Sequence, residues 1–265
     1  MKNMGIYVHI PFCKHKCNYC DFVSYEGKEN LIKDYIECLL YEIKEVGEGN
    51  ILDAENGLDE LVNVKTIYIG GGTPSIIDSK YIIDIINTIK NSFRMDKQVE
   101  ITIEINPGTC TKEKLQDYYN SGINRLSIGL QVADDNLLKQ LGRIHNYNDF
   151  LNTYKMATKI GFNNINVDLM LGIPNQNMSI LEDSINKVTK LKPQHISVYS
   201  LIVEEGTNLS KDIENGIYTL PEDEEERDMY WNMKKILKGK GFNHYEISNF
   251  ARPGFASKHN LDCWN

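Results

Sequence analysis

Short β-branched runs alternate along the chain with stretches that have helical spacing. The apolar runs begin at Ile6, Thr66, Glu100, Arg125, Asn166 and His195. Between the first two, apolar residues at positions 32, 35, 36, 39, 40 and 43 follow the i, i+3, i+4 spacing of a helix buried on one face. Gly122 and Gly161 each stand where such a helix would end. The alternation predicts parallel βα units, and in a barrel of such units the functional groups gather at the carboxyl ends of the strands.

Two polar segments interrupt this alternation. Residues Glu45 to Val64 contain Gly and Asn, and we expect a loop there between the first helix and the second strand. The run PEDEEERD starts at Pro221 and predicts the first turn of an exposed helix, because acidic side chains suit the helix dipole at that end.

Composition excludes several classes of protein. The 265 residues include 29 Lys and Arg against 37 Asp and Glu, a net charge of -8, so no basic surface is predicted for nucleic acid or anionic lipid. No stretch approaches the roughly 18 to 20 apolar residues of a membrane span. We therefore predict a cytoplasmic protein that does not bind nucleic acid and is not an integral membrane protein.

Three of the six cysteines lie close together, at Cys13, Cys17 and Cys20, on a loop that leaves the first strand. Thiolates at this density repel one another unless a metal neutralises them, and iron–sulfur clusters are held by Cys thiolates. A structural zinc site would need a fourth ligand, for which only His15 is near, and we expect His15 to be a surface residue. On four irons, three Cys leave one iron without a protein ligand. Structural thiols are predicted at Cys38, Cys110 and Cys263.

Several polar residues stand at the ends of the later strands. The second strand ends in three glycines followed by Thr73, and a turn without Cβ atoms lets a ligand approach the backbone. Glu104, Gln131 and Asp168 interrupt the next three apolar strands, where a buried polar group must find a partner. We expect these residues to line one pocket.

The sequence resembles the radical S-adenosylmethionine (radical SAM) superfamily. The motif that carries this is YVHIPFCKHKCNYC, and the further stretches GGGTPS, INRLSIGLQ, HYEISNFARPG and HNLDCW resemble the group that contains the oxygen-independent coproporphyrinogen III oxidase and the HemW-type haem chaperones. The resemblance implies an α/β fold, a partial, three-quarter (β/α)6 barrel over residues 1–205 with a short C-terminal extension over residues 206–265. It also implies a 4Fe-4S cluster on the three clustered Cys, with SAM chelating the open iron.

The resemblance also assigns roles to residues. Gly72 and Thr73 would receive the methionyl amino group of SAM, Glu104 the ribose hydroxyls, and Arg143 the carboxylate, which suits a guanidinium fork. The complete SAM site implied in this way consists of Tyr7, Phe22, Gly72, Thr73, Glu104, Gln131, Arg143, Asp168 and Ile202.

Two activities are compatible with this group, haem delivery and oxidative decarboxylation of coproporphyrinogen III. Phe22 stands where the oxidase has a further Cys. Only four or five residues precede the first strand, which are too few to cover a barrel mouth. Both features favour the chaperone, with the oxidase as the alternative. His259 lies in a stretch that resembles the chaperone motif His-Asn-x-x-Tyr-Trp, with Cys263 at the Tyr position, and we predict it as a haem ligand.

Members of the group usually continue beyond this motif, so we expect the chain to be truncated. The expected partners are haem, an electron donor for the cluster, haem-requiring respiratory proteins and, as one option, a second copy of the chain.

Overall fold

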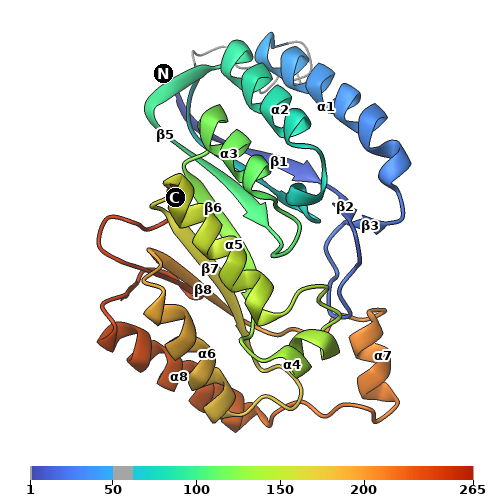
Figure 1. Ribbon diagram of the computed structural model, residues 1–265, viewed down its shortest axis with the longest axis vertical. Coiled ribbons are helices and arrows are strands. Elements are labelled where there is room, and N and C mark those ends of the chain that lie inside the picture. Colours follow the sequence, from blue (N-terminus) through green and yellow to red (C-terminus); the bar gives the residue numbers. More distant parts are fainter. Residues whose placement is uncertain (1, 50–61, 265) are drawn as a thin grey trace.

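The computed structural model describes residues 2–49 and 62–264 and shows one curved sheet with helices on its convex face (Figure 1). Six strands run parallel in the order β1, β4, β5, β6, β7, β8. Their bounds are β1 Lys2–Ile10, β4 Val62–Gly71, β5 Arg94–Ile105, β6 Arg125–Gln131, β7 Ile165–Leu171 and β8 His195–Ser200. This is the predicted partial (β/α)6 barrel.

The sheet continues beyond β8 with two short antiparallel strands from the expected C-terminal extension. β10 (Asn249–Ala251) pairs with β8, and β9 (Asn243–His244) pairs with β10. Two further strands, β2 (Phe12–Cys13) and β3 (Tyr25–Glu26), pair with each other beside the cluster loop. The division of the chain at residue 205 stays a prediction.

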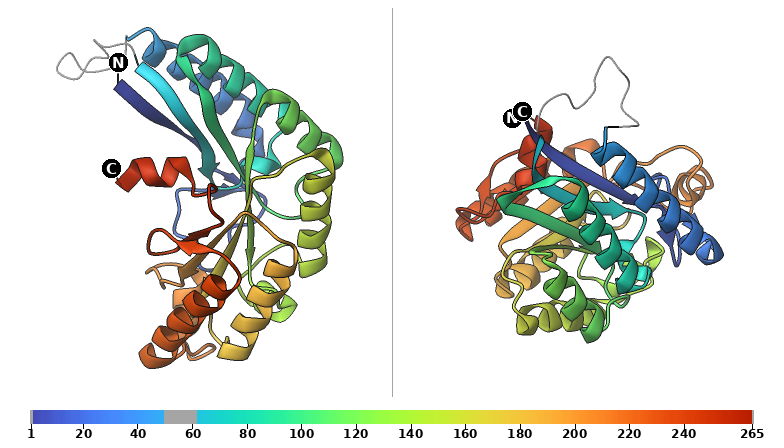
Figure 2. Two further views of the ribbon diagram at one scale, coloured as in Figure 1. Left: turned by 90° about the vertical axis from the view of Figure 1, so that its left-hand side faces the viewer. Right: turned by 90° about the horizontal axis from the view of Figure 1, so that it is seen from above.

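Helices cover the outer face and leave the concave face to the C-terminal segment, as Figure 2 shows. The crossover helices are α1 Ile32–Gly47, α2 Ser79–Ser92, α3 Lys112–Ser121, α4 Asp135–Gln140, α5 Tyr147–Ile160 and α6 Met178–Lys190. They are followed by α7 Asn208–Glu214, α8 Asp223–Gly239 and α9 Lys258–Trp264, with short 3-10 turns at Glu29–Leu31 and Pro74–Ile76. α9 lies against the concave face and contacts β4. None of the helices in residues 2–49 and 62–264 is long and apolar enough to span a membrane.

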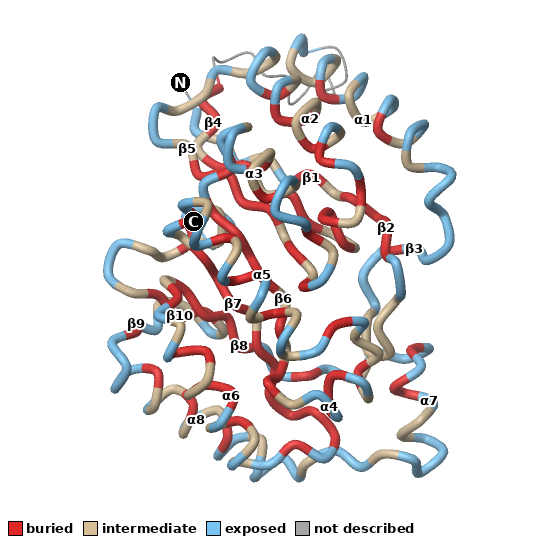
Figure 3. Tube along the Cα trace, viewed as in Figure 1, coloured by how far each residue is buried: buried red, intermediate tan, exposed pale blue. Residues whose placement is uncertain are grey.

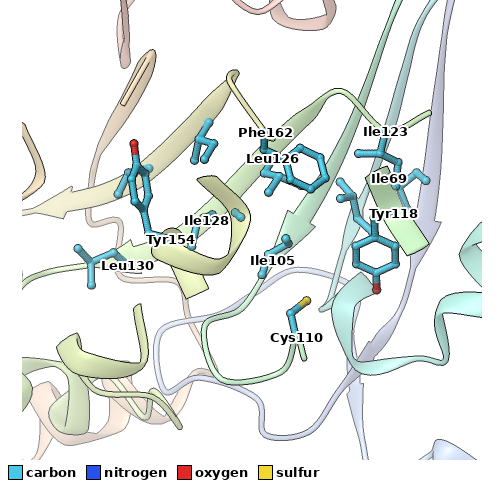
Figure 4. Packing of buried hydrophobic residues seen from close by; sticks show 14 of the residues in the cluster. Ile69, Ile105, Cys110, Tyr118, Ile123, Leu126, Ile128, Leu130, Tyr154 and Phe162 are labelled. Atoms are coloured by element: carbon cyan, nitrogen blue, oxygen red, sulfur yellow. The ribbon is translucent and has the colours of Figure 1, made fainter. Parts of the chain in front are cut away.

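The main core lies between the sheet and its outer helices, which gives the buried band across the centre of Figure 3. On β6, Leu126, Ile128 and Leu130 face this core and pack near Tyr154 and Phe162 in Figure 4. The alternate residues of β6 belong to the concave face, where hydrogen-bonding side chains predominate. A strand points successive side chains to opposite faces, so one apolar run builds both the core and the polar interior.

Several local predictions are tested by this architecture. Gly122 and Gly161 follow α3 and α5 with φ of 98° and 123°, so both helix ends are confirmed, as is the acidic first turn of α8. The predicted loop from Glu45 to Val64 was too long at both ends, since α1 continues to Gly47 and β4 starts at Val62; residues 50–61 lie outside the described residues.

The predictions for the isolated thiols are only partly correct. Cys110 is buried, as a structural thiol should be, and lies in the core of Figure 4. Cys38 and Cys263 are exposed, so their prediction from the usual burial of Cys was wrong. Cys38 lies on a face of α1 that the sheet does not cover, and Cys263 lies near the end of α9.

Candidate functional site

A cavity of about 520 Å3 opens at the carboxyl ends of the strands, between them and the cluster loop. Such a volume is in the range of small-molecule and cofactor sites. Eleven of the thirteen predicted site residues line it: Cys13, Cys17, Cys20, Phe22, Gly72, Thr73, Glu104, Gln131, Arg143, Asp168 and Ile202. The two others, Tyr7 and His259, do not line it.

The three clustered cysteines face the cavity with hydrogen-bond donors on two of their sulfurs. Thr73 Oγ1 donates to Cys13 Sγ at 3.5 Å, and Arg143 Nη1 donates to Cys17 Sγ at 3.5 Å. Both contacts favour thiolates, which are the form that binds metal. Burial raises the pKa of Cys20.

No three His, Cys, Asp or Glu side chains in residues 2–49 and 62–264 converge on a point that could hold a single metal ion. A multi-iron cluster offers each thiolate its own iron, so the sulfurs need not converge in that way. His15 is exposed at the rim of the cavity, where its Nδ1 lies 3.1 Å from Glu26 Oε2.

The glycine turn after β4 brings bare backbone against the cluster loop. Gly71 has φ of 116°, which side-chain-bearing residues rarely adopt, and the Gly72 amide donates to the Ile10 carbonyl at 2.9 Å. A Cβ on Gly72 would lie 2.8 Å from the Phe12 carbonyl oxygen and 3.0 Å from Cys13 Sγ. The turn therefore tolerates only glycine at this contact with the metal-binding loop.

Glu104 lines the cavity, and two hydrogen-bond donors hold its carboxylate. The Tyr68 hydroxyl donates to its Oε1 at 2.9 Å and the Gly71 amide to its Oε2 at 3.2 Å. Burial and the negative charge of Asp168 raise the pKa of Glu104 to about 7 despite these donors. Glu104 therefore carries a weakly basic, oriented carboxylate that can accept hydrogen bonds from a ligand.

Asp168 stands on β7, within electrostatic range of Glu104. Its two oxygens accept from Asn166 Nδ2 at 2.7 Å and from Ser127 Oγ at 3.0 Å. Burial raises the pKa of Asp168, and the same two hydrogen bonds oppose that effect. Two carboxylates with raised pKa at one cavity are typical of a functional site.

Gln131 and Arg143 contribute polar groups that lack protein partners. Gln131 has φ of 67°, and its buried Oε1 makes no hydrogen bond within the described ranges. Arg143 donates from Nη2 to the Gly129 carbonyl at 2.8 Å and to Asn106 Oδ1, while its Nε has no partner among the described residues. Strained backbone and unsatisfied buried atoms persist where a site is prepared for a ligand.

The comparisons with known proteins agree with this geometry. The family model described as Radical SAM superfamily matches residues 7–188. The chain belongs to the radical SAM superfamily. The predicted superfamily and fold class are thereby confirmed.

Curated relatives of this radical SAM chain carry the name "Heme chaperone HemW". The one from Bacillus subtilis is 39% identical over 260 residues, which cover 98% of this chain and 66% of that protein. Those from Lactococcus lactis and Escherichia coli are 36% and 34% identical. The chain thus spans just under two thirds of the length of these relatives.

Among solved structures, the coproporphyrinogen III oxidase HemN from Escherichia coli superposes with a TM-score of 0.81 at 23% identity, over 96% of this chain and 56% of that one. Elp3 from Methanocaldococcus infernus superposes with a TM-score of 0.60 at 16% identity, over 89% of this chain and 54% of that one. At these identities, the likeness describes the radical SAM fold alone.

The residues present fit the cofactors of a radical SAM protein. The cavity is bordered by three thiols and by the turn at Gly72, where an added methyl group would have no room. It is also bordered by two residues with unpartnered buried atoms, Gln131 Oε1 and Arg143 Nε. Sequence reasoning missed Tyr19, Tyr68, Asn106 and Tyr199, which also line it. Tyr68 could have been found by strand alternation, because it lies two residues before Gly70 on the same face of β4.

Tyr7 and His259, which do not line the cavity, both contact the ring of Tyr68. The Tyr7 and His259 rings stack on Tyr68 with centroid distances of 6.1 Å and 5.2 Å. His259 Nδ1 lies 2.9 Å from Thr66 Oγ1, so the ring is fixed by β4. A separate open hollow of about 380 Å3 is lined by Tyr199, Asn249, Asn260, Cys263 and Trp264.

Proposed function

We propose that the chain is a HemW-like radical SAM protein that binds a 4Fe-4S cluster, SAM and haem and delivers haem to respiratory enzymes. The observation that carries the proposal is the meeting of eleven predicted residues, from the cluster loop and the ends of successive strands, around one cavity. Names of relatives support the haem-related part, since several are called haem chaperones.

Cys13, Cys17 and Cys20 would hold the cluster, and Thr73 and Arg143 would stabilise sulfur charge through the contacts they already make. A reduced cluster of this kind supplies one electron to the sulfonium of SAM. The protein's part is to bind and orient SAM and to exclude water, and Phe22 and Ile202 contribute apolar side chains to the cavity lining.

SAM would be held by complementary polar groups. The turn at Gly72 and Thr73 offers backbone to the amino group, and Arg143 offers a cation to the carboxylate. Glu104 would accept from the ribose hydroxyls, with Gln131 and Asp168 completing the polar wall. Tyr7 would act only through its stacking on Tyr68.

Haem would be ligated by His259. Ligating His residues usually use one ring nitrogen for the metal and the other for an orienting hydrogen bond. Thr66 engages Nδ1, and Nε2 makes no hydrogen bond in the described part of the chain, so Nε2 is the candidate ligand atom. The nearby hollow beside Asn260 and Trp264 offers a ring and open volume for a porphyrin face.

The alternative is an oxygen-independent coproporphyrinogen III oxidase. The similarity of the fold to HemN favours this alternative, but a shared fold alone does not establish a shared activity. The remaining parts of the proposal are an unidentified electron donor, haem-requiring respiratory proteins as acceptors, a cytoplasmic location and, as one option, a homodimer.

The deciding experiment offers two tetrapyrroles to anaerobically reconstituted protein in the presence of SAM and a reductant. Haem and coproporphyrinogen III are supplied separately, and products are separated by liquid chromatography. We expect stable haem binding and no decarboxylated product. Conversion of coproporphyrinogen III to protoporphyrinogen IX would replace the chaperone by the oxidase.

A further inference from the structure

A chain of hydrogen bonds leads from Asp168 in the cavity to the C-terminal segment. Asn166 Nδ2 donates to Asp168 Oδ1 at 2.7 Å, and Asn166 Oδ1 lies 2.6 Å from His195 Nδ1. His195 Nε2 lies 2.8 Å from the Tyr245 hydroxyl, which accepts from the Ser257 amide at 3.3 Å. Asn166 and His195 are buried, so water does not substitute for these partners.

The direction of every bond in this chain follows from its neighbours. Asn166 Nδ2 also donates to Ser127 Oγ at 2.8 Å, so both of its hydrogens are used and the amide is fixed with its Oδ1 toward His195. His195 must therefore donate from Nδ1, and its Nε2 must accept from Tyr245. Burial lowers the pKa of His195 well below its ordinary value, which keeps the ring neutral and able to do both.

Other ionisable groups also face Asp168 from the neighbouring strands, and none of them takes over the hydrogen bond that Asn166 donates to it. Glu104 on β5 is a second carboxyl group, and Tyr68 on β4 and Tyr199 on β8 are phenols that stay neutral because burial raises their pKa. Arg125 on β6 is 2% exposed, and its Nε has no hydrogen-bond partner among the described residues. Its positive charge lowers the pKa of Asp168 and opposes the effect of burial. Asn166 and Ser127 donate the two short hydrogen bonds to the Asp168 carboxylate, and of these two residues only Asn166 leads on to His195.

We propose that His195 and Tyr245 are positioning residues for the SAM site, which act on Asp168 through Asn166. The proposal rests on the proposed function, in which Asp168 lines the SAM pocket. It gives the stretch HYEISNF, which contains Tyr245 and Asn249, a task in the barrel: Tyr245 supports His195, and Asn249 Oδ1 accepts from Ser197 Oγ at 2.7 Å.

The test is a series of three variants at increasing distance from Asp168 along the hydrogen bonds: Asn166→Leu, His195→Phe and Tyr245→Phe. SAM affinity of the cluster-loaded protein should fall about tenfold, about fivefold and about twofold in that order, because each step acts through one more hydrogen bond. The matched control is Tyr154→Phe, which removes another buried hydroxyl, bonded to the Leu191 carbonyl on the outer helices, and should leave SAM affinity unchanged.

A second measurement does not require SAM. Carboxyl 13C NMR of aspartate-labelled, cluster-free protein follows the titration of Asp168, assigned by its loss in Asp168→Asn. The Asp168 pKa should rise in the first two variants and stay unchanged in Tyr154→Phe, an effect that general loss of stability does not produce.

The outcomes distinguish a failure of the proposed SAM binding from a failure of the positioning roles of His195 and Tyr245. Wild-type protein that binds no SAM, with an Asp168 titration that still responds to the variants, would overturn the proposed function and leave the positioning network. Normal SAM binding and an unmoved Asp168 titration in all three variants would overturn the positioning roles. Tyr245→Phe changes a single hydroxyl, so it keeps the test open if the larger changes prevent folding.

Discussion

Replacing Glu104 by Gln should stabilise the cluster-free protein at alkaline pH although it weakens SAM binding. Glu104 lies beside Asp168 in the polar interior, and burial with this like charge raises its pKa from 4.5 to about 7. The native state therefore holds the Glu104 proton more tightly than the unfolded chain does. Stability is lost as pH rises from the unfolded pKa to the folded pKa, and Gln has no charge to bury.

The size of the effect follows from the two pKa values. Each factor of ten in acidity is worth about 1.4 kcal/mol, so a change from 4.5 to about 7 corresponds to about 3 kcal/mol above pH 7. This is an upper limit, because the open cavity leaves Glu104 partly accessible to solvent. Between pH 5 and pH 8 the Gln variant should gain about 2 kcal/mol on the wild type. The hydrogen bonds that Gln alters with Tyr68 and Gly71 act at both pH values and largely cancel in this difference.

Urea unfolding of both proteins at pH 5 and pH 8 measures this difference directly. The control is Glu37→Gln on the exposed face of α1, where Glu37 pairs with Lys33 and the difference should be close to zero. In the same variant pair, calorimetry should show SAM affinity about tenfold weaker for Glu104→Gln. A free energy change for Glu104→Gln that is the same at both pH values would refute the reasoning.

Two further predictions concern the cluster turn and haem. Gly72→Ala should lose bound iron, because its Cβ would lie 2.8 Å from the Phe12 carbonyl oxygen. Gly239→Ala at the end of α8 should keep it, because no described atom lies within 4 Å of the added Cβ. Equal iron contents would contradict the steric argument. His259→Ala should weaken haem binding and shift the Soret band while leaving SAM affinity unchanged, and Thr66→Val should do so to a smaller extent. Wild-type affinity and spectrum in His259→Ala would place the haem ligand elsewhere.

The strand ends could be predicted from sequence because they obey a local rule. A polar residue such as Glu104 or Asp168 within an apolar run must face either the core or the interior of the barrel, and the alternation of side chains makes the interior the only place where several such residues can meet. The glycine turn and the clustered Cys are likewise local signals. Together they predict most of the cavity wall.

The concave face could not be predicted in this way, because it depends on pairings between distant segments. Nothing local in β10 indicates that it pairs antiparallel with β8, and nothing in α9 indicates that His259 reaches Thr66 across the sheet. The same holds for the hydrogen bond between His195 and Tyr245, which are 50 residues apart. The exposure of Cys38 was missed because residue type alone does not say which face of α1 it occupies.

The most direct test of the account is the iron and sulfide content of anaerobically reconstituted protein in two matched triple variants. One replaces Cys13, Cys17 and Cys20 by Ser, and the other replaces Cys38, Cys110 and Cys263. A 4Fe-4S cluster predicts about four irons and four sulfides in the wild type and in the second variant, and almost none in the first. Retention of the full complement in the first variant, or its loss only in the second, would contradict the assignment of the cluster to this cavity.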